Sequence, residues 1–143
     1  GQVACAIVAV YFGAKAAMQL KPATLHVFNP YGATKAFGEA LGHWFYDEYG
    51  MEFLAVRIGY FSGRYSEPQL DELWLRRIWL GPRDAGRFFQ LAVSAPAFGY
   101  GIVYACSRAK ENYLDLTSAR TLLGYEPAEE VPWPAAGGNN LAR

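Results

Sequence analysis

The chain has 143 residues, of which 52% are hydrophobic, and its 13 basic and 13 acidic residues give a formal net charge of zero. A hydrophobic chain of this length can bury one domain core, which excludes an intrinsically disordered protein. Because the charges are balanced and basic residues are not massed, nothing indicates a nucleic-acid partner or an anionic membrane surface.

The cysteine and histidine content excludes several kinds of site. Cys5 and Cys106 are the only cysteines, and His26 and His43 have no partner at ligand spacing. Two thiols this far apart form neither a disulfide framework nor a metal-binding pattern, so we expect no metal site and a reducing cytoplasm. The apolar run Val3–Gly13 is too short to span a membrane and no positive charge precedes it, which favours a buried strand over a signal peptide.

Three strands and three helices are predicted in chain order. The apolar runs Val3–Phe12, Met51–Tyr60 and Tyr100–Cys106 are typical of strands covered on both faces of a parallel sheet. Helical spacing and helix start and stop signals occur over residues 31–49, 82–94 and 116–123, with mainly loop over 13–30 and 61–80. Strand, helix and strand of these lengths make a βαβ unit, so the expected class is α/β.

The segment Asn29–Leu41 contains the pattern with the clearest chemical use. Pro30 suits a helix start, and Tyr31 and Lys35, four residues apart, then stand on one helix face. An ammonium beside a phenol favours the phenolate, which can take a proton from a substrate hydroxyl. The alternative is an ordinary amphipathic helix. Its apolar stripe would consist of Ala33, Phe37, Ala40, Leu41 and Trp44.

Further motifs follow this helix in a recognisable order. Pro-Tyr-Gly-Ala-Thr-Lys at 30–35 is followed by Val-Arg-Ile-Gly at 56–59 and by Leu-Gly-Tyr-Glu-Pro at 123–127. In this order the chain resembles the C-terminal half of an extended short-chain dehydrogenase/reductase, the NAD-dependent epimerase/dehydratase family. Within that family it is most similar to the uronate dehydrogenase branch. The resemblance covers about residues 3–127, and we expect this half-domain over 1–127 and a loosely ordered tail over 128–143.

The resemblance implies hydride transfer between a sugar or sugar-acid hydroxyl and NAD or NADP. Tyr31 would be the general base, and Lys35 would tune it and bind the nicotinamide ribose. Both residues would therefore contact the cofactor, together with Ile58, Gly59 and Tyr60.

The resemblance also implies a substrate side. The expected substrate contacts are Ile7, Tyr60, Arg64 and Gln69, with Arg76 or Arg77 as further candidates for pairing a substrate carboxylate. The alternative for each arginine is a solvated loop charge.

One departure from the family concerns the serine that precedes the tyrosine. Counting back from Tyr31 places Ala6 at this position, with Cys5 beside it. Alanine cannot donate a hydrogen bond and a thiol donates weakly. Losing such a donor costs about 10²–10³ in rate. Thr24 and Thr34 are less favoured substitutes.

The second departure is the absence of any Gly-x-Gly-x-x-Gly or Gly-x-x-Gly-x-x-Gly pattern in the 143 residues. We therefore expect a partial Rossmann-like parallel sheet with flanking helices that lacks the N-terminal dinucleotide-fingerprint βαβ unit. The chain could be a fragment, could be completed by another chain, or could have lost cofactor binding. The functional alternative is a non-catalytic binding protein, and the helix Tyr31–Tyr49 is a candidate homodimer contact.

Overall fold

A computed structural model describes residues 5–11, by backbone, together with 30–61 and 73–131. The elements in chain order are β1 (Cys5–Tyr11), α2 (Pro30–Tyr49), β2 (Glu52–Ile58), α3 (Leu73–Arg76), α4 (Pro82–Ser94), β3 (Tyr100–Ala105) and α5 (Thr117–Leu123). The three strands form one parallel sheet in the order β1-β2-β3. The expected α/β class with a Rossmann-like parallel sheet is therefore confirmed. No helix of the described residues is long and apolar enough to cross a membrane.

The register of the sheet brings the carboxyl ends of all three strands to one edge. Tyr11 at the end of β1 pairs with Ile58, and Ile58 pairs with Ala105 at the end of β3. In open parallel sheets this edge is where ligands bind. Residues that follow β2 directly are therefore placed at the edge where a site is expected.

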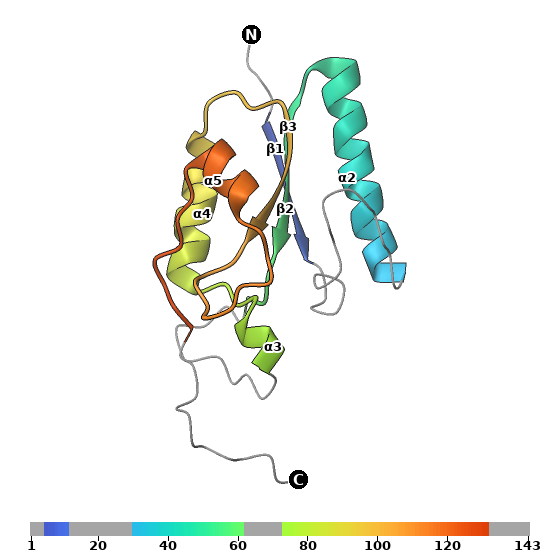
Figure 1. Ribbon diagram of the computed structural model, residues 1–143. Coiled ribbons are helices and arrows are strands. Elements are labelled where there is room, and N and C mark those ends of the chain that lie inside the picture. Colours follow the sequence, from blue (N-terminus) through green and yellow to red (C-terminus); the bar gives the residue numbers. More distant parts are fainter. Residues whose placement is uncertain (1–4, 12–29, 62–72, 132–143) are drawn as a thin grey trace, which may run out of the picture.

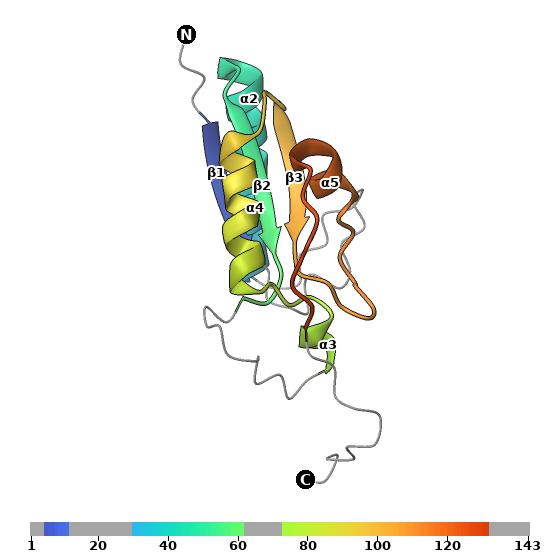
Figure 2. The same cartoon turned by 90° about the vertical axis from the view of Figure 1, so that its left-hand side faces the viewer.

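Helices cover both faces of the sheet. In Figure 1, α2 lies on one side of the strands and α4 and α5 lie on the other, and the turned view in Figure 2 agrees. The core lies mainly between the sheet and α4. It includes the fully buried side chains of Leu54, Val56, Phe88, Val103 and Tyr125. Because strand residues alternate between faces, Phe53 and Arg57 point to the α2 side instead.

α2 contacts the sheet through a narrow face with small side chains. Its buried residues are Gly32, Ala36, Glu39 and Gly42. The predicted apolar stripe lies outside this face, since Phe37, Leu41 and Trp44 are 67%, 40% and 48% exposed. The aromatic side chains of α2 are thus not part of the core described here, and pairing with a second copy through them stays a prediction.

Two glycines end helices where the sequence predicts. Gly50 after α2 and Gly124 after α5 have φ of 64° and 63°, the left-handed region that glycine adopts at little cost. The Gly50 amide donates to the carbonyl of Tyr46, which satisfies the last turn of α2. The chain can therefore enter β2 after one intervening residue.

Two glycines of α2 should respond in opposite ways to alanine. A Cβ on Gly42 would overlap the buried ring of Phe53, whereas a Cβ on Gly38 would meet nothing within 4 Å. We expect Gly42→Ala to destabilise the fold by about 1–3 kcal/mol through overpacking, and Gly38→Ala to stabilise it by up to about 1 kcal/mol through helix propensity. Urea unfolding of both variants measures the difference. Equal effects would contradict the close contact between α2 and β2.

Candidate active site

The first turns of α2 bring Tyr31 and Lys35 together. Lys35 Nζ lies 4.9 Å from the centroid of the Tyr31 ring. The phenol is 45% exposed and Lys35 is half-buried. The Thr34 hydroxyl donates to the Tyr31 carbonyl at 2.7 Å, so Thr34 contacts the helix backbone here. An accessible phenol beside an ammonium is the arrangement that the spacing predicts.

The direction of α2 places this pair at the carboxyl edge of the sheet. Gly42 packs on Phe53 near the start of β2, and Glu39 pairs with Arg57 near its end. α2 therefore runs opposite to β2, and its first turns extend towards the edge where β2 ends. Figure 1 shows the start of α2 at the end of the sheet to which the arrowheads point.

The segment after β2 is held at the same edge by backbone hydrogen bonds. The Gly59 amide donates to the Ala105 carbonyl at 2.9 Å, and the Tyr60 amide donates to the Ile78 carbonyl at 2.8 Å. A Cβ on Gly59 would overlap that Ile78 carbonyl, so only glycine fits. Ile58, Gly59 and Tyr60 thus lie at the edge to which α2 brings Tyr31.

The structure does not bring the β1 candidates to this edge. The register pairs Cys5, Ala6 and Ile7 with residues 52–54, at the beginning of β2. Ala6 lies five residues before Tyr11, which is about 16 Å along a strand. The strand continues past Ala6 and ends at Tyr11, so Ala6 lies away from this edge, and its assignment to the serine position stays a prediction. The positions after Tyr11 lie outside the described residues.

The remaining substrate candidates divide into two groups. Arg64, Gln69 and the substitute donor Thr24 lie outside the described residues. Arg77 donates to Glu111 at 2.7 Å and covers the Tyr113 ring, which is a structural role. Arg76 is half-buried at the end of α3.

A buried ion pair joins α2 to β2. The Arg57 guanidinium donates through Nε and Nη2 to the two Glu39 carboxylate oxygens, at 2.8 and 2.9 Å. Burial alone would lower the pKa of Arg57, but the hydrogen bonds and charge of Glu39 outweigh it and raise the pKa. Desolvation, followed by the Glu39 charge, raises the pKa of the neighbouring Tyr100 phenol. Arg57 therefore stays charged beneath α2.

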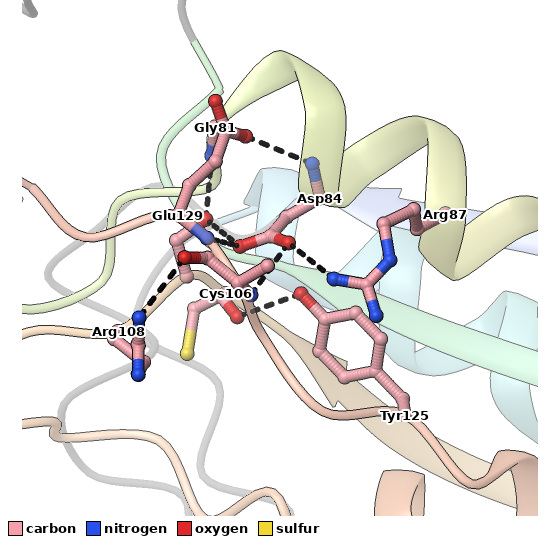
Figure 3. A network of polar contacts seen from close by, with 9 residues as sticks. Gly81, Asp84, Arg87, Cys106, Arg108, Tyr125 and Glu129 are labelled. Atoms are coloured by element: carbon pink, nitrogen blue, oxygen red, sulfur yellow. Dashed lines mark hydrogen bonds and ion pairs between the residues drawn. The ribbon is translucent and has the colours of Figure 1, made fainter.

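A second buried carboxylate holds the start of α4 to the end of the described chain (Figure 3). Asp84 is fully buried and accepts from the Ser107 hydroxyl at 2.7 Å and from the amides of Ala128 and Glu129 at 2.8 and 2.9 Å. The Glu129 carboxylate in turn accepts from the Asp84 amide at 2.8 Å. Each carboxylate thus satisfies backbone donors of the other segment.

This network changes the expectation for the tail. Residues 128–131 pack on the domain, because Val131 is buried and its amide donates to the Arg108 carbonyl at 3.1 Å. The boundary predicted at 127 therefore falls within a packed segment, and residues 132–143 lie outside the described part. The division into domains stays a prediction.

Cys106 lies next to this network and is not a reactive thiol. It is a buried free cysteine, and desolvation, helped by the Asp84 charge, raises the pKa of its thiol to about 12. At neutral pH the thiolate is therefore scarcely populated. Within the described residues no group of three or more potential metal ligands comes together.

Sequence reasoning did not single out either buried carboxylate. Arg57 offers a signal, because a charged residue within the apolar strand Glu52–Ile58 requires a buried partner. Its position does not say which carboxylate that is. Asp84 looks like a favourable first-turn residue of a helix, and its contacts 44 and 45 residues away have no sequence signature.

Comparisons with known proteins find sugar and sugar-acid dehydrogenases among the relatives of this chain. An NAD-dependent glucose-6-phosphate dehydrogenase from Haloferax volcanii is 33% identical over 101 residues, covering 71% of this chain and 37% of the relative. A uronate dehydrogenase from Pseudomonas putida is 31% identical over 99 residues, covering 69% of this chain and 35% of the relative. The chain is a homologue of NAD-dependent sugar dehydrogenases. No family model matches it.

Solved structures support the same relationship. The glucuronic acid dehydrogenase from Chromohalobacter salexigens matches with a TM-score of 0.57 and 29% identity, over 70% of this chain and 35% of that structure. A uronate dehydrogenase from Agrobacterium tumefaciens, solved as a tyrosine-to-alanine mutant with NAD, has the same fold at 22% identity and a TM-score of 0.58. The resemblance to the uronate dehydrogenase branch is thus confirmed. This homologue spans less than half the length of these relatives.

The Asp84 network should be important for stability. Asp84→Ala leaves the Ser107 hydroxyl and two backbone amides without their acceptor, and we expect a loss of about 2–5 kcal/mol in the free energy of unfolding. Asp47→Ala is the matched control, because Asp47 is exposed and contacts only His43 at 3.8 Å among described residues. That control should change stability by less than about 0.5 kcal/mol in urea unfolding. Similar losses for both variants would contradict the role of Asp84.

Proposed function

We propose that this chain is the catalytic half of an NAD(P)-dependent dehydrogenase that oxidises a sugar or sugar acid. The observation that carries the proposal is the Tyr31–Lys35 pair at the carboxyl edge of a parallel sheet. Its homology to sugar dehydrogenases supports the reaction class. The uronate and glucose-6-phosphate relatives define the first substrates to test.

In this proposal Tyr31 acts as the general base. Oxidation of a sugar hydroxyl to a carbonyl releases one hydride and one proton, and the Tyr31 oxygen accepts the proton. A bound nicotinamide would supply the hydride acceptor. Lys35, whose Nζ lies 4.9 Å from the centroid of the Tyr31 ring, would donate to the ribose hydroxyls of the cofactor. The partial exposure of Tyr31 leaves its oxygen within reach of a substrate.

The described residues fit the nicotinamide end of such a cofactor. Lys35 pairs with no carboxylate among the described residues, so its ammonium hydrogens are available to ribose hydroxyls. Gly59 lets two backbone segments approach closely at the strand end, next to Tyr60. The sequence has no Gly-rich turn for the pyrophosphate. We therefore propose that this chain contributes the nicotinamide and substrate side of the site.

Replacing the base tests the proposal directly. We expect Tyr31→Phe to lower kcat for uronate or aldose oxidation by about 10²–10⁴-fold, because the proton acceptor is lost. Tyr49→Phe is the matched control, since Tyr49 is on the same helix, 64% exposed and distant in sequence from the pair. The measurement is the absorbance of reduced nicotinamide with NAD and with NADP over a panel of uronates and aldose phosphates. An unchanged rate for Tyr31→Phe would exclude Tyr31 as the base.

A second candidate function is a non-catalytic binding protein. It is favoured by the missing Gly-rich turn and by the exposed aromatic side chains of Phe37, Trp44 and Tyr49 on α2. Because this class requires no cofactor, titration with NAD should then leave tryptophan fluorescence unchanged. If the proposed enzyme function holds, NAD should change the fluorescence with saturation.

A further inference from the structure

We propose that Glu39 and Arg57 are positioning residues that set where the Tyr31–Lys35 turn lies relative to the end of β2. This inference rests on the proposed function, since the pair to be positioned is the proposed base and its lysine. Neither Glu39 nor Arg57 is proposed to touch the reacting atoms. They act through the placement of α2.

The pair is buried and its geometry is specific. Glu39 is 3% exposed and Arg57 is 6% exposed. Two parallel hydrogen bonds of 2.8 and 2.9 Å join the guanidinium to both carboxylate oxygens. A planar fork on a planar carboxylate is satisfied at one relative orientation, and a shift of either element would leave a buried charge partly unpaired.

The pair lies between the two halves of the proposed site. Glu39 is four residues after Lys35, so it is about one helical turn, or 6 Å, along the same face of α2. Arg57 is two residues before Gly59, where the segment on the nicotinamide side begins. Among residues 30–61 and 73–131, the ion pair is therefore the buried polar link nearest in sequence to both parts.

A third element strengthens this link. Arg57 Nη1 donates to the Tyr104 hydroxyl of β3 at 2.9 Å, and the Tyr100 hydroxyl donates to the Glu39 carbonyl at 3.2 Å. The carboxylate, its helix backbone and two strands are thus connected in one network. A rotation or slide of α2 would break contacts to both strands together.

The small face of α2 explains why such a link is needed. The other residues that α2 buries against the sheet are Gly32, Ala36 and Gly42. Such side chains allow a close approach, but they interlock little with a flat sheet and restrict sliding weakly. Apolar replacement of a buried ion pair often preserves stability, so stability alone does not account for the pair. Directional hydrogen bonds supply the missing constraint on position.

The test uses a variant that separates position from stability. In the full chain, the double variant Glu39→Met with Arg57→Met removes both charges at similar volume, and Arg57→Lys keeps the charge but loses the fork. Arg83→Lys, at an exposed position on α4, is the matched control. For each we measure thermal midpoint, kcat, KM for NAD and hydrogen exchange of segments 31–41 and 82–94 by mass spectrometry.

We expect the double variant to keep its thermal midpoint while kcat falls about 10²-fold, with KM for NAD changed less than about twofold. In Arg57→Lys we expect kcat to fall less than in the double variant, and in Arg83→Lys we expect kcat to stay unchanged. If the double variant keeps both the thermal midpoint and the kcat of the unsubstituted chain, the inference is overturned. If the double variant does not fold, the Arg57→Lys variant tests the inference instead. A kcat of Arg57→Lys equal to that of the unsubstituted chain overturns the inference.

Hydrogen exchange separates this inference from the proposed function. If the unsubstituted chain oxidises none of the sugars, the proposed function fails, but exchange still reports on α2. If the double variant then exchanges faster than the unsubstituted chain in segment 31–41, and equally fast in segment 82–94, the result supports the placement of α2 by the pair. If the double variant exchanges at the same rate as the unsubstituted chain in both segments, the inference is overturned.

Discussion

The close approach of α2 to β2 is the constraint on which the rest of this structure depends. Gly42 leaves room for the ring of Phe53, and one turn earlier the Glu39 carboxylate meets the Arg57 guanidinium under the same helix. The contact of Gly42 with Phe53 requires that residue 42 has no side chain, and the contact of Glu39 with Arg57 requires two opposite charges with matched geometry. Together they determine the direction and depth of α2, and so the place of Tyr31 and Lys35.

The carboxyl edge of the sheet gathers the features of the site because all three strands are parallel. Tyr11, Ile58 and Ala105 end their strands at one level, and Gly59 then passes beneath the Ile78 carbonyl where a side chain would not fit. On the other side of the sheet, the Asp84 carboxylate holds residues 128 and 129 against the start of α4. Two buried carboxylates on different elements thus connect α2 to the sheet and α4 to residues 128 and 129.

Homology and geometry make different contributions. The matches cover only 37% of the NAD-dependent glucose-6-phosphate dehydrogenase and 35% of the uronate dehydrogenase, so these relatives support a reaction class and leave the activity of this chain to experiment. The geometry supports the part of that reaction that these residues could perform. It offers a phenol and an ammonium for proton transfer, and it provides glycine at the point of closest backbone approach.

The sequence by itself determined the elements, because periodicity and stop residues act locally. Patterns within a few residues predict the helix at Tyr31, its end at Gly50, the helix from Pro82 to Ser94 and the three strands. The contact between Tyr31 and Lys35 is equally local, since any helix brings residues four apart together.

Tertiary structure decided what depends on register and on distant partners. The count back from Tyr31 selected Ala6, whereas pairing with β2 places Ala6 at the far end of its strand. The aromatic stripe of α2 lies away from the sheet, because close packing required glycine and alanine on the inner face. Glu39 lies 18 residues from Arg57, and Ala128 and Glu129 lie 44 and 45 residues from Asp84. Only the folded sheet and its helices bring these partners within hydrogen-bonding distance.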